Sequence, residues 1–345
     1  MATRHAVLGI ELPVVQAPMA GVQGSALAIA VSQAGGLGSL PCAMLAPEGI
    51  RSELAAMRAG TDRPFNVNFF CHREPAADAG RESAWRAALA PYYREYGIDP
   101  EGIAAGAGRL PFSAEAAEVL EAFRPPVVSF VFGLPEPALL ARVRSLGALV
   151  VATATTVDEA LWLERQGVDV VVAQGWEAGG HRGNFLSDDL SLQSSTLALV
   201  PQVVRAVKIP VIAAGGIADA SGVAAVLALG AIAAQVGTTY LLCAEATTNP
   251  THRQALSSPE ARHTLVTNLY TGRPARGIVT PLMRDLGAMS ELSPPFPLAT
   301  AALLPLRQAS ERRGQPGFMP LWCGQNPSGC RAVPAAELTR ELAGA

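Results

Sequence analysis

The chain has 345 residues, of which half are hydrophobic and 16% are charged, and its formal net charge at pH 7 is -3. This composition excludes a disordered chain, and no apolar run reaches the roughly 18 residues that a membrane span needs. The basic residues are spread along the sequence, which argues against nucleic acid as a partner. Because the N-terminal residues also lack the apolar core of a signal peptide, we expect a soluble, cytoplasmic protein.

The five cysteines are scattered, and none forms a C-x-x-C pair with another. Disulfide frameworks and structural zinc sites both need closely and regularly spaced cysteines. The sequence therefore predicts neither a disulfide nor a metal site. It leaves the oligomeric state open.

Short apolar runs alternate with helical patterns along most of the chain. The first predicted strand opens the segment 13–20, which ends in a proline-bearing turn, and the others are residues 35–40, 65–70, 126–132, 148–152, 169–174, 210–214 and 231–237. The predicted helices between and after them are residues 24–34, 47–59, 135–145, 156–166, 195–207 and 219–229. Parallel strands need crossover helices, and eight such strands close with no free edge. We therefore predict an α/β fold, a (β/α)8 TIM barrel.

Two regions do not follow this alternation. Residues 71–124 are too long for one connection and contain helical patterns at 81–95 and 114–123, so we interpret them as a helical excursion after the third strand. Residues 246–345 follow the eighth strand and predict a C-terminal extension that covers the barrel, which itself takes residues 1–245. Within the extension, Phe318–Gln325 (FMPLWCGQ) favours a packed tail, with a pocket wall as the alternative.

The sixth strand ends at Gln174 and is soon followed by Gly179, Gly180 and His181. In α/β enzymes the chemistry lies at the carboxyl ends of the strands. Glycines let a ligand approach the backbone closely, and a histidine exchanges protons near neutral pH. Taken alone, the pattern fits a catalytic histidine and a surface histidine after a glycine turn equally well.

Glycine-bearing loops also end the last two strands. Gly215 and Gly216 follow the seventh strand, and the segment Gln235, Val236, Gly237 and Thr238 ends the eighth. TIM barrels commonly bind phosphate there through backbone N–H groups. Neither loop contains Lys or Arg, so the backbone would supply most of the binding.

Three further side chains suit a flavin ring. Asn68 ends the third strand and Gln174 the sixth, and their amides can both donate and accept hydrogen bonds, as the ring requires. Met19, after the first strand, offers a soft apolar contact for one ring face. Together with the phosphate loops these residues predict a flavin mononucleotide (FMN) site. The alternative without a flavin is a phosphate-binding barrel that acts as an isomerase, a lyase or a ligand-binding protein.

At these motifs the chain resembles the nitronate monooxygenase family, formerly called 2-nitropropane dioxygenases, which are FMN-dependent TIM barrels. The matching segments follow the family's order: QAPMAG at 16–21, NVNFF at 66–70, VSFVFGLP at 128–135, QGWEAGGHRG at 174–183, AAGGI at 213–217, QVGT at 235–238 and WCGQ at 322–325.

This resemblance implies that His181 is catalytic. It implies flavin binding by Ala17, Pro18, Met19, Asn68, Gln174, Gly179, Gly180, Gly215, Gly216, Gln235, Val236, Gly237 and Thr238. The implied reaction oxidises alkyl nitronates with O2 to carbonyl compounds and nitrite. His181 would remove the α-proton of a neutral nitroalkane or, when protonated, hold the nitro oxygens. The alternative is an FMN-dependent NAD(P)H reductase, because enoyl-acyl-carrier-protein reductases and some quinone reductases share the barrel and a similar Gly-Gly-His.

Two departures from the family pattern bear on this alternative. Family members often carry a histidine where this chain has Val131, and tyrosines and a lysine where residues 296–313 contain neither. Both regions are expected to shape the substrate side of the pocket. Finally, we interpret His72, just after the third strand, as a surface loop histidine, with a polar pocket group as the alternative.

Overall fold

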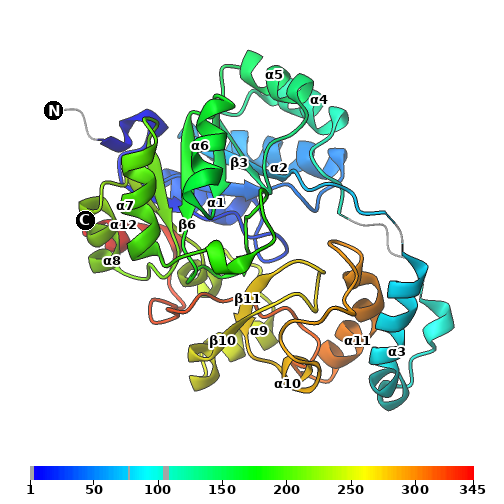
Figure 1. Cartoon of the computed structure of the whole chain (residues 1–345). Coiled ribbons are helices and arrows are strands. Elements are labelled where there is room, and N and C mark those ends of the chain that lie inside the picture. Colours follow the sequence, from blue (N-terminus) through cyan, green and yellow to red (C-terminus); the bar gives the residue numbers. More distant parts are fainter. Residues whose placement is uncertain (1–3, 77, 104–108) are drawn as a thin grey trace.

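The computed structural model describes residues 4–76, 78–103 and 109–345 of the chain. Eight parallel strands form its centre: β1 (Val14–Gln16), β2 (Gly38–Pro41), β3 (Phe65–Phe70), β4 (Val127–Val131), β5 (Leu149–Ala154), β6 (Val170–Gln174), β8 (Val211–Ala214) and β9 (Ala233–Val236). Their hydrogen-bonded order is β1-β9-β8-β6-β5-β4-β3-β2. A parallel bridge between Val15 and Leu37 joins the two ends of this order. The predicted TIM barrel is confirmed (Figure 1).

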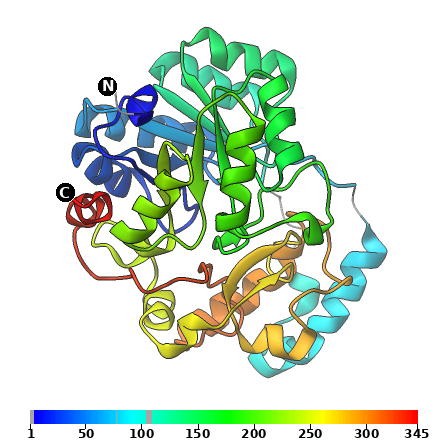
Figure 2. The ribbon, with the colours of Figure 1, turned by 60° about the vertical axis from the view of Figure 1, so that its left-hand side comes forward.

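Helices form the outer wall of the barrel (Figure 2): α1 (Ser25–Gln33), α2 (Pro47–Gly60), α4 (Ala114–Phe123), α5 (Pro137–Ser145), α6 (Val157–Arg165), α7 (Thr196–Ala206), α8 (Ala220–Ala228) and α12 (Ala335–Ala343). Four of them begin at a side chain that accepts a backbone N–H of the first turn, namely Ser113, Thr156, Ser195 and Asp219. Such caps satisfy donors that the helix itself leaves free.

One wall helix differs from the sequence prediction. The sequence assigns residues 114–123 to the excursion, but α4 packs between α2 and α5 and so belongs to the wall. The last helix of the extension, α12, packs on the barrel against α1, α8 and β1. The division at residue 245 stays a prediction about domains. The chain on its C-terminal side nevertheless supplies part of the barrel wall.

The core has two layers. The larger one lies between the strands and the wall helices, and the smaller one includes barrel strand residues such as Val151, Val170 and Ile212. Leu8 and Ile10 join the smaller cluster from the N-terminal segment, whose first turn is η1 (Arg4–Leu8). Burying each such side chain contributes roughly 1.5–3 kcal/mol relative to leaving it exposed.

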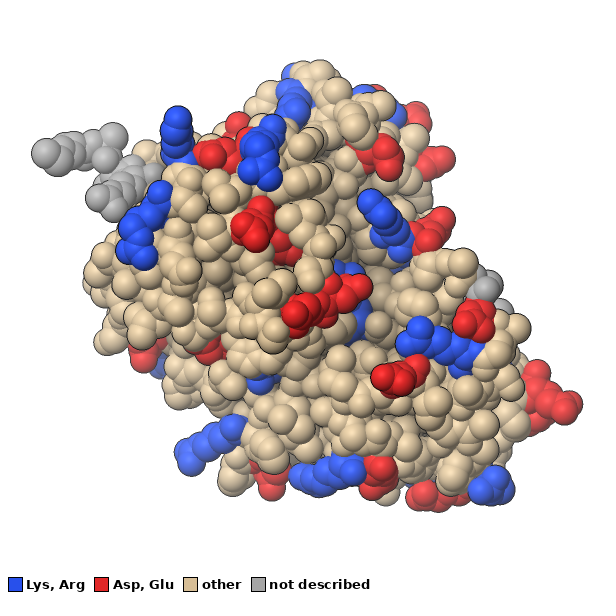
Figure 3. Space-filling model, viewed as in Figure 1, with Lys and Arg blue, Asp and Glu red and all other residues tan. Residues whose placement is uncertain are grey.

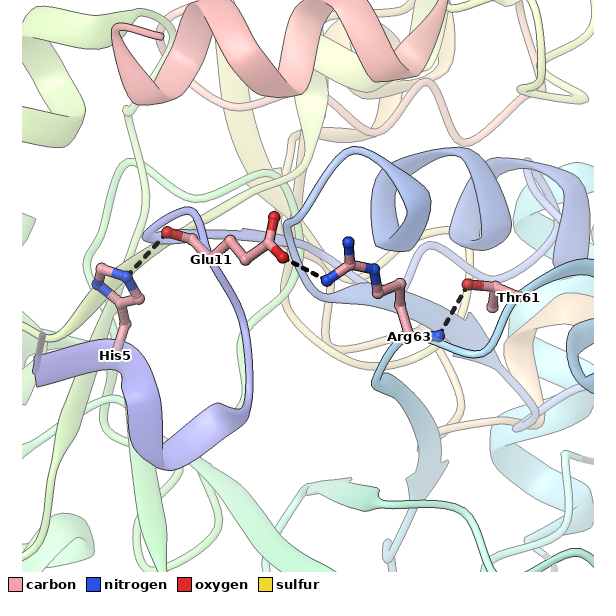
Figure 4. Close-up of polar contacts among 4 residues, drawn as sticks. All are labelled: His5, Glu11, Thr61 and Arg63. Carbon is pink, nitrogen blue, oxygen red and sulfur yellow. Dashed lines mark hydrogen bonds and ion pairs between the residues drawn. The ribbon is translucent and has the colours of Figure 1, made fainter. Parts of the chain in front are cut away.

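The N-terminal segment is also tied to the chain before β3. Figure 4 shows that the carboxylate of Glu11 pairs with the guanidinium of Arg63, while its carbonyl oxygen lies 3.0 Å from Nε2 of His5. The backbone N–H of Arg63 donates to the hydroxyl of Thr61 at 3.1 Å. Because the Glu11–Arg63 pair is exposed, it fixes geometry more than it adds stability.

A cover lies over one end of the barrel (Figures 1 and 2). It contains α3 (Ala79–Tyr96), η2 (Pro100–Gly102), α9 (Pro250–Leu256), η5 (Pro259–Arg262), β10 (Thr264–Thr267), β11 (Ala275–Ile278), α10 (Pro281–Leu286) and α11 (Ala299–Arg312). The short strand β7 (Gly180–His181) pairs antiparallel with β11, which in turn pairs with β10. The remaining short elements are η3 (Leu190–Leu192) and η4 (Thr238–Leu242).

Helix α3 joins the excursion to the extension. It packs against α11, and Tyr93 donates its hydroxyl proton to the carbonyl of Ala302 at 2.8 Å. Trp85 of α3 is buried in the same cluster. Two segments that lie far apart in the sequence therefore build one cover. No helix in the described part of the chain is long and apolar enough to cross a membrane.

Candidate active site

A cavity of about 1450 Å³, counting the part open to solvent, lies where the barrel strands end and the cover begins. Its wall takes residues from the ends of the barrel strands, from β7 and from the cover segment around Trp322. Residues from several barrel strands and from the cover therefore enclose one shared space, as is usual for small-molecule sites.

Most residues that the resemblance implies line this one cavity: Ala17, Pro18, Met19, Asn68, Gln174, Gly179, Gly180, His181, Gly215, Gly216, Gln235, Gly237 and Thr238. Val236 does not, because successive side chains of a strand point to opposite faces. Its side chain is buried in the layer between strands and helices, next to Gln235, which faces the cavity.

One end of the cavity presents free backbone donors. Within residues 109–345, the N–H groups of Gly215, Gly216, Gly237 and Thr238 have no hydrogen-bond acceptor. Gly215 and Gly216 have φ angles of 122° and 70°, which other residues rarely adopt. Backbone N–H groups gathered at one place bind anions such as phosphate. The donor set therefore fits the phosphate of a nucleotide cofactor.

The segment around Trp322 completes this end of the cavity. Asn326 donates its side-chain N–H to the carbonyl of Gly216 at 3.1 Å, and Gly324 donates its backbone N–H to the Thr238 hydroxyl at 2.9 Å. A Cβ at Gly179 would lie 2.5 Å from the nitrogen of Gly324, so glycine is required there. The sequence favours a packed tail for Phe318–Gln325. That prediction is wrong for Trp322 and Gly324, which line the cavity.

The side-chain amides of Asn68 and Gln174, which the sequence predicts to contact the flavin ring, are held in place by hydrogen bonds within the protein. Asn68 donates to the hydroxyl of Ser129 at 2.9 Å, which leaves its amide oxygen without a protein partner among the described residues. Gln174 donates to the carbonyl of His181 at 3.0 Å and accepts from the N–H of Gly183 at 2.8 Å. Gln174 therefore holds the turn between β6 and β7 as well as facing the cavity.

His181 lies on β7, where its backbone pairs with Ala275 of β11. Its Nε2 is 2.9 Å from the hydroxyl oxygen of Thr271. Four aromatic rings surround the imidazole with centroids 5.4 to 6.3 Å away: Phe70, Phe132, Phe296 and Trp322. Burial, followed by the charges of Arg109 and Arg273, lowers the pKa of His181 well below its usual value. The ring is therefore neutral at pH 7.

His72 is buried, with 6% of its surface exposed, so its interpretation as a surface histidine is wrong. Its Nε2 lies 2.8 Å from the carbonyl oxygen of Arg109, and its ring packs edge-on against Phe296. Arg109 itself lines the cavity, as do Val131, Phe132 and His252. Sequence analysis did not single out Arg109, Phe132 or His252. Only Phe132 gave a local signal, because it stands in the VSFVFGLP motif.

Three features of the described residues bear on metal and nucleic-acid binding: clusters of metal-ligating side chains, the state of the cysteines and the surface charge. No cluster of three or more His, Cys, Asp or Glu that could hold a metal occurs among residues 4–76, 78–103 and 109–345. The five cysteines are free thiols. On the face shown in Figure 3, acidic and basic side chains are interspersed, without a continuous basic patch.

A family model described as nitronate monooxygenase matches residues 2–344. The chain belongs to the nitronate monooxygenase family. The nitronate monooxygenase of Paraburkholderia phytofirmans is 42% identical over 340 residues, which cover 97% of this chain and 92% of that protein. The nitronate monooxygenase of Pseudomonas aeruginosa is also 42% identical, and the alignment covers 97% of this chain and 96% of that one.

Solved structures agree with this family. Nitroalkane oxidase from Streptomyces ansochromogenes superposes with a TM-score of 0.88 at 39% identity and covers 99% of this chain and 97% of its own. FabK from Thermotoga maritima is less similar, with a TM-score of 0.72 at 28% identity and coverages of 99% and 95%. The resemblance found in the sequence is confirmed. This member of a flavin-dependent family is an oxidoreductase that acts on a small molecule.

Proposed function

We propose that the enzyme is an FMN-dependent nitronate monooxygenase that oxidises alkyl nitronates with O2 to carbonyl compounds and nitrite. The observation that carries the proposal is a single cavity with free backbone N–H groups at one end and a neutral histidine among aromatic rings. The chain has this cavity in the family whose relatives bear that name.

The flavin would be held by residues from several strand ends. The N–H groups of Gly215, Gly216, Gly237 and Thr238 suit a single phosphate, as in a mononucleotide, because no cationic side chain accompanies them in these loops. Asn68 offers an amide oxygen to the ring. When bound, the flavin supplies an electron acceptor for the nitronate and an electron donor for O2.

His181 would act as the base for neutral nitroalkanes. A neutral imidazole can accept the α-proton, and the product is the nitronate anion. The rings of Phe132, Phe296 and Trp322 pack around the imidazole and would shield part of it from water. Because the ring is neutral at pH 7, it brings no positive charge to a nitronate that enters the site already ionised.

The proposal predicts that the purified protein is yellow and releases FMN on denaturation, identified by chromatography and mass. It also predicts rapid O2 uptake with propyl-2-nitronate and release of nitrite, without NADH or NADPH. Anaerobic addition of NADH or NADPH should leave the flavin colour unchanged. Rapid bleaching of the flavin by either nucleotide, together with no nitronate-dependent O2 uptake, would favour the reductase alternative. A protein that binds no flavin would favour the phosphate-binding barrel.

A further inference from the structure

The permanent charge on the cavity wall is of one sign, positive. Among the described residues that line the cavity, Arg109 is the one with a permanent charge, and Asp, Glu and Lys are absent. The Nη1 atom of Arg109 is buried and has no hydrogen-bond partner in the described structure. A cation removed from water without a counterion is costly. Burial, with a smaller effect of the nearby Arg307, lowers the pKa of Arg109 to about 10, so it is still charged at pH 7.

Arg109 lies on the same side of the cavity as His181. Its guanidinium carbon is 5.6 Å from the centre of the Phe296 ring, and that ring is centred 5.4 Å from His181. The charge of Arg109 is also one cause of the lowered pKa of His181. A small ligand beside His181 is therefore within the field of the Arg109 guanidinium.

The backbone, and not the guanidinium, holds Arg109 in place. The buried His72 donates from Nε2 to the carbonyl oxygen of Arg109 at 2.8 Å, and its ring packs on Phe296. This contact fixes the backbone of the residue, while Nη1 of the guanidinium has no acceptor among the described residues.

Arg273, the other cation near His181, is not available in this way. Its guanidinium donates to the carbonyls of Arg182 and Asn184 and stacks on Phe132 at 4.1 Å. Its hydrogen bonds serve the protein, and it does not line the cavity. Of the two arginines, Arg109 is the one that faces a ligand.

We propose that Arg109 determines specificity for anionic substrates by binding the two oxygens of the nitronate. The proposal rests on the proposed function. A guanidinium presents its N–H groups as a planar fork that matches two oxygens on one planar centre. The anion is thus held by Arg109, while the neutral imidazole of His181 remains free to accept the α-proton of a neutral nitroalkane.

The test compares the flavin-loaded wild type with Arg109→Gln, Arg109→Lys and the control Arg307→Gln. Arg307→Gln removes a charge near Arg109 from a residue that does not line the cavity. The probes are isobutyrate, which copies the shape and charge of propyl-2-nitronate, and its neutral amide, isobutyramide, each titrated by calorimetry. Hydrogen bonds to charged groups typically contribute enough for a change of about 10- to 100-fold. Arg109→Gln should weaken isobutyrate binding by that factor and raise the KM for propyl-2-nitronate similarly.

Isobutyramide should bind all four proteins within about twofold, and Arg109→Lys should retain part of the affinity for isobutyrate because it keeps the charge without the fork. Unchanged isobutyrate binding in Arg109→Gln overturns the proposal. An equal loss of isobutyramide, or an equal loss in Arg307→Gln, overturns it too, because cavity shape or the general field would then explain the effect. If isobutyrate binding depends on Arg109 but no nitronate is oxidised, the anion site stands and the proposed function fails.

Discussion

The hydroxyl of Thr271 lies between His181 and the carbonyl of Arg273. Its oxygen is 2.9 Å from Nε2 of His181 and 3.4 Å from that carbonyl oxygen. A hydroxyl has one proton to donate. If Thr271 donates to Arg273, Nε2 must carry the imidazole proton, and Nδ1 then has the lone pair that a base needs. Thr271 is therefore a positioning residue that acts through His181.

Thr271→Val keeps the shape of the side chain and removes the hydroxyl, so it should lower kcat with neutral nitroalkanes by roughly 10-fold, less than the 10²- to 10⁴-fold expected for His181→Asn. Thr271→Ser restores the hydroxyl and should recover most of the activity. With preformed nitronates, which need no proton removed, both Thr271 variants should stay within about threefold of wild type. Stopped-flow assays on both substrates measure this. Equal losses on both substrates would assign Thr271 a role in packing alone.

Local sequence explains which site residues could be predicted. His181 and the glycines of the phosphate loops stand in short motifs at strand ends, where the fold itself places the chemistry. Arg109 and Thr271 stand in no such motif. Thr271 meets His181 from the cover, and Arg109 is brought near the site by its contacts with His72 and Phe296. His72 looked like a loop histidine because nothing in the sequence shows that Phe296 packs over it.

The same distinction applies to whole elements. All eight barrel strands could be predicted, because most of them are short apolar runs between turns, as strands buried on both faces are. Strand β7 was missed because two residues show no periodicity, and it exists through its pairing with β11 almost a hundred residues later. Helix α11 contains Pro305 and lies in a region rich in proline, which hid its boundaries. Elements that depend on distant partners leave little local signal.

Helix α12 tests whether the end of the chain is part of the barrel. Leu338 is buried with 2% of its surface exposed, and α12 packs between α1 and α8. Leu338→Ala should therefore lower the free energy of unfolding by about 2–5 kcal/mol, as cavity-forming changes do. Leu304→Ala on α11, where the side chain is 46% exposed, should change it by less than about 0.5 kcal/mol. Urea denaturation of both variants measures these free energies of unfolding. Equally small decreases in both variants would mean that α12 is only loosely attached to the barrel.

At the scale of the whole molecule, three neutral histidines lie at or beside the cavity. His252 on α9 donates from Nε2 to the carbonyl of Trp322 at 3.2 Å and so joins the cover to the cavity wall. Burial, opposed in part by that hydrogen bond, lowers its pKa to about 4. Burial also lowers the pKa values of His72 and His181. The histidines at and beside the cavity are therefore held in the neutral form in the folded protein.

This arrangement predicts a loss of stability in acid. An unfolded histidine titrates near pH 6.5, so below that value the unfolded chain binds a proton that folded His252 refuses until about pH 4. The free energy of unfolding must therefore fall as the pH falls through this window, by about 2 kcal/mol from His252 alone between roughly pH 7.5 and pH 5. His252→Gln keeps a donor for Trp322 but cannot titrate, so its stability should fall less over the same range. His263→Gln, which changes an exposed histidine, should follow the wild type. Urea titrations of the flavin-loaded proteins at both pH values measure this change in the free energy of unfolding. An identical pH dependence in His252→Gln and wild type would show that His252 is protonated in the folded state as readily as in the unfolded chain.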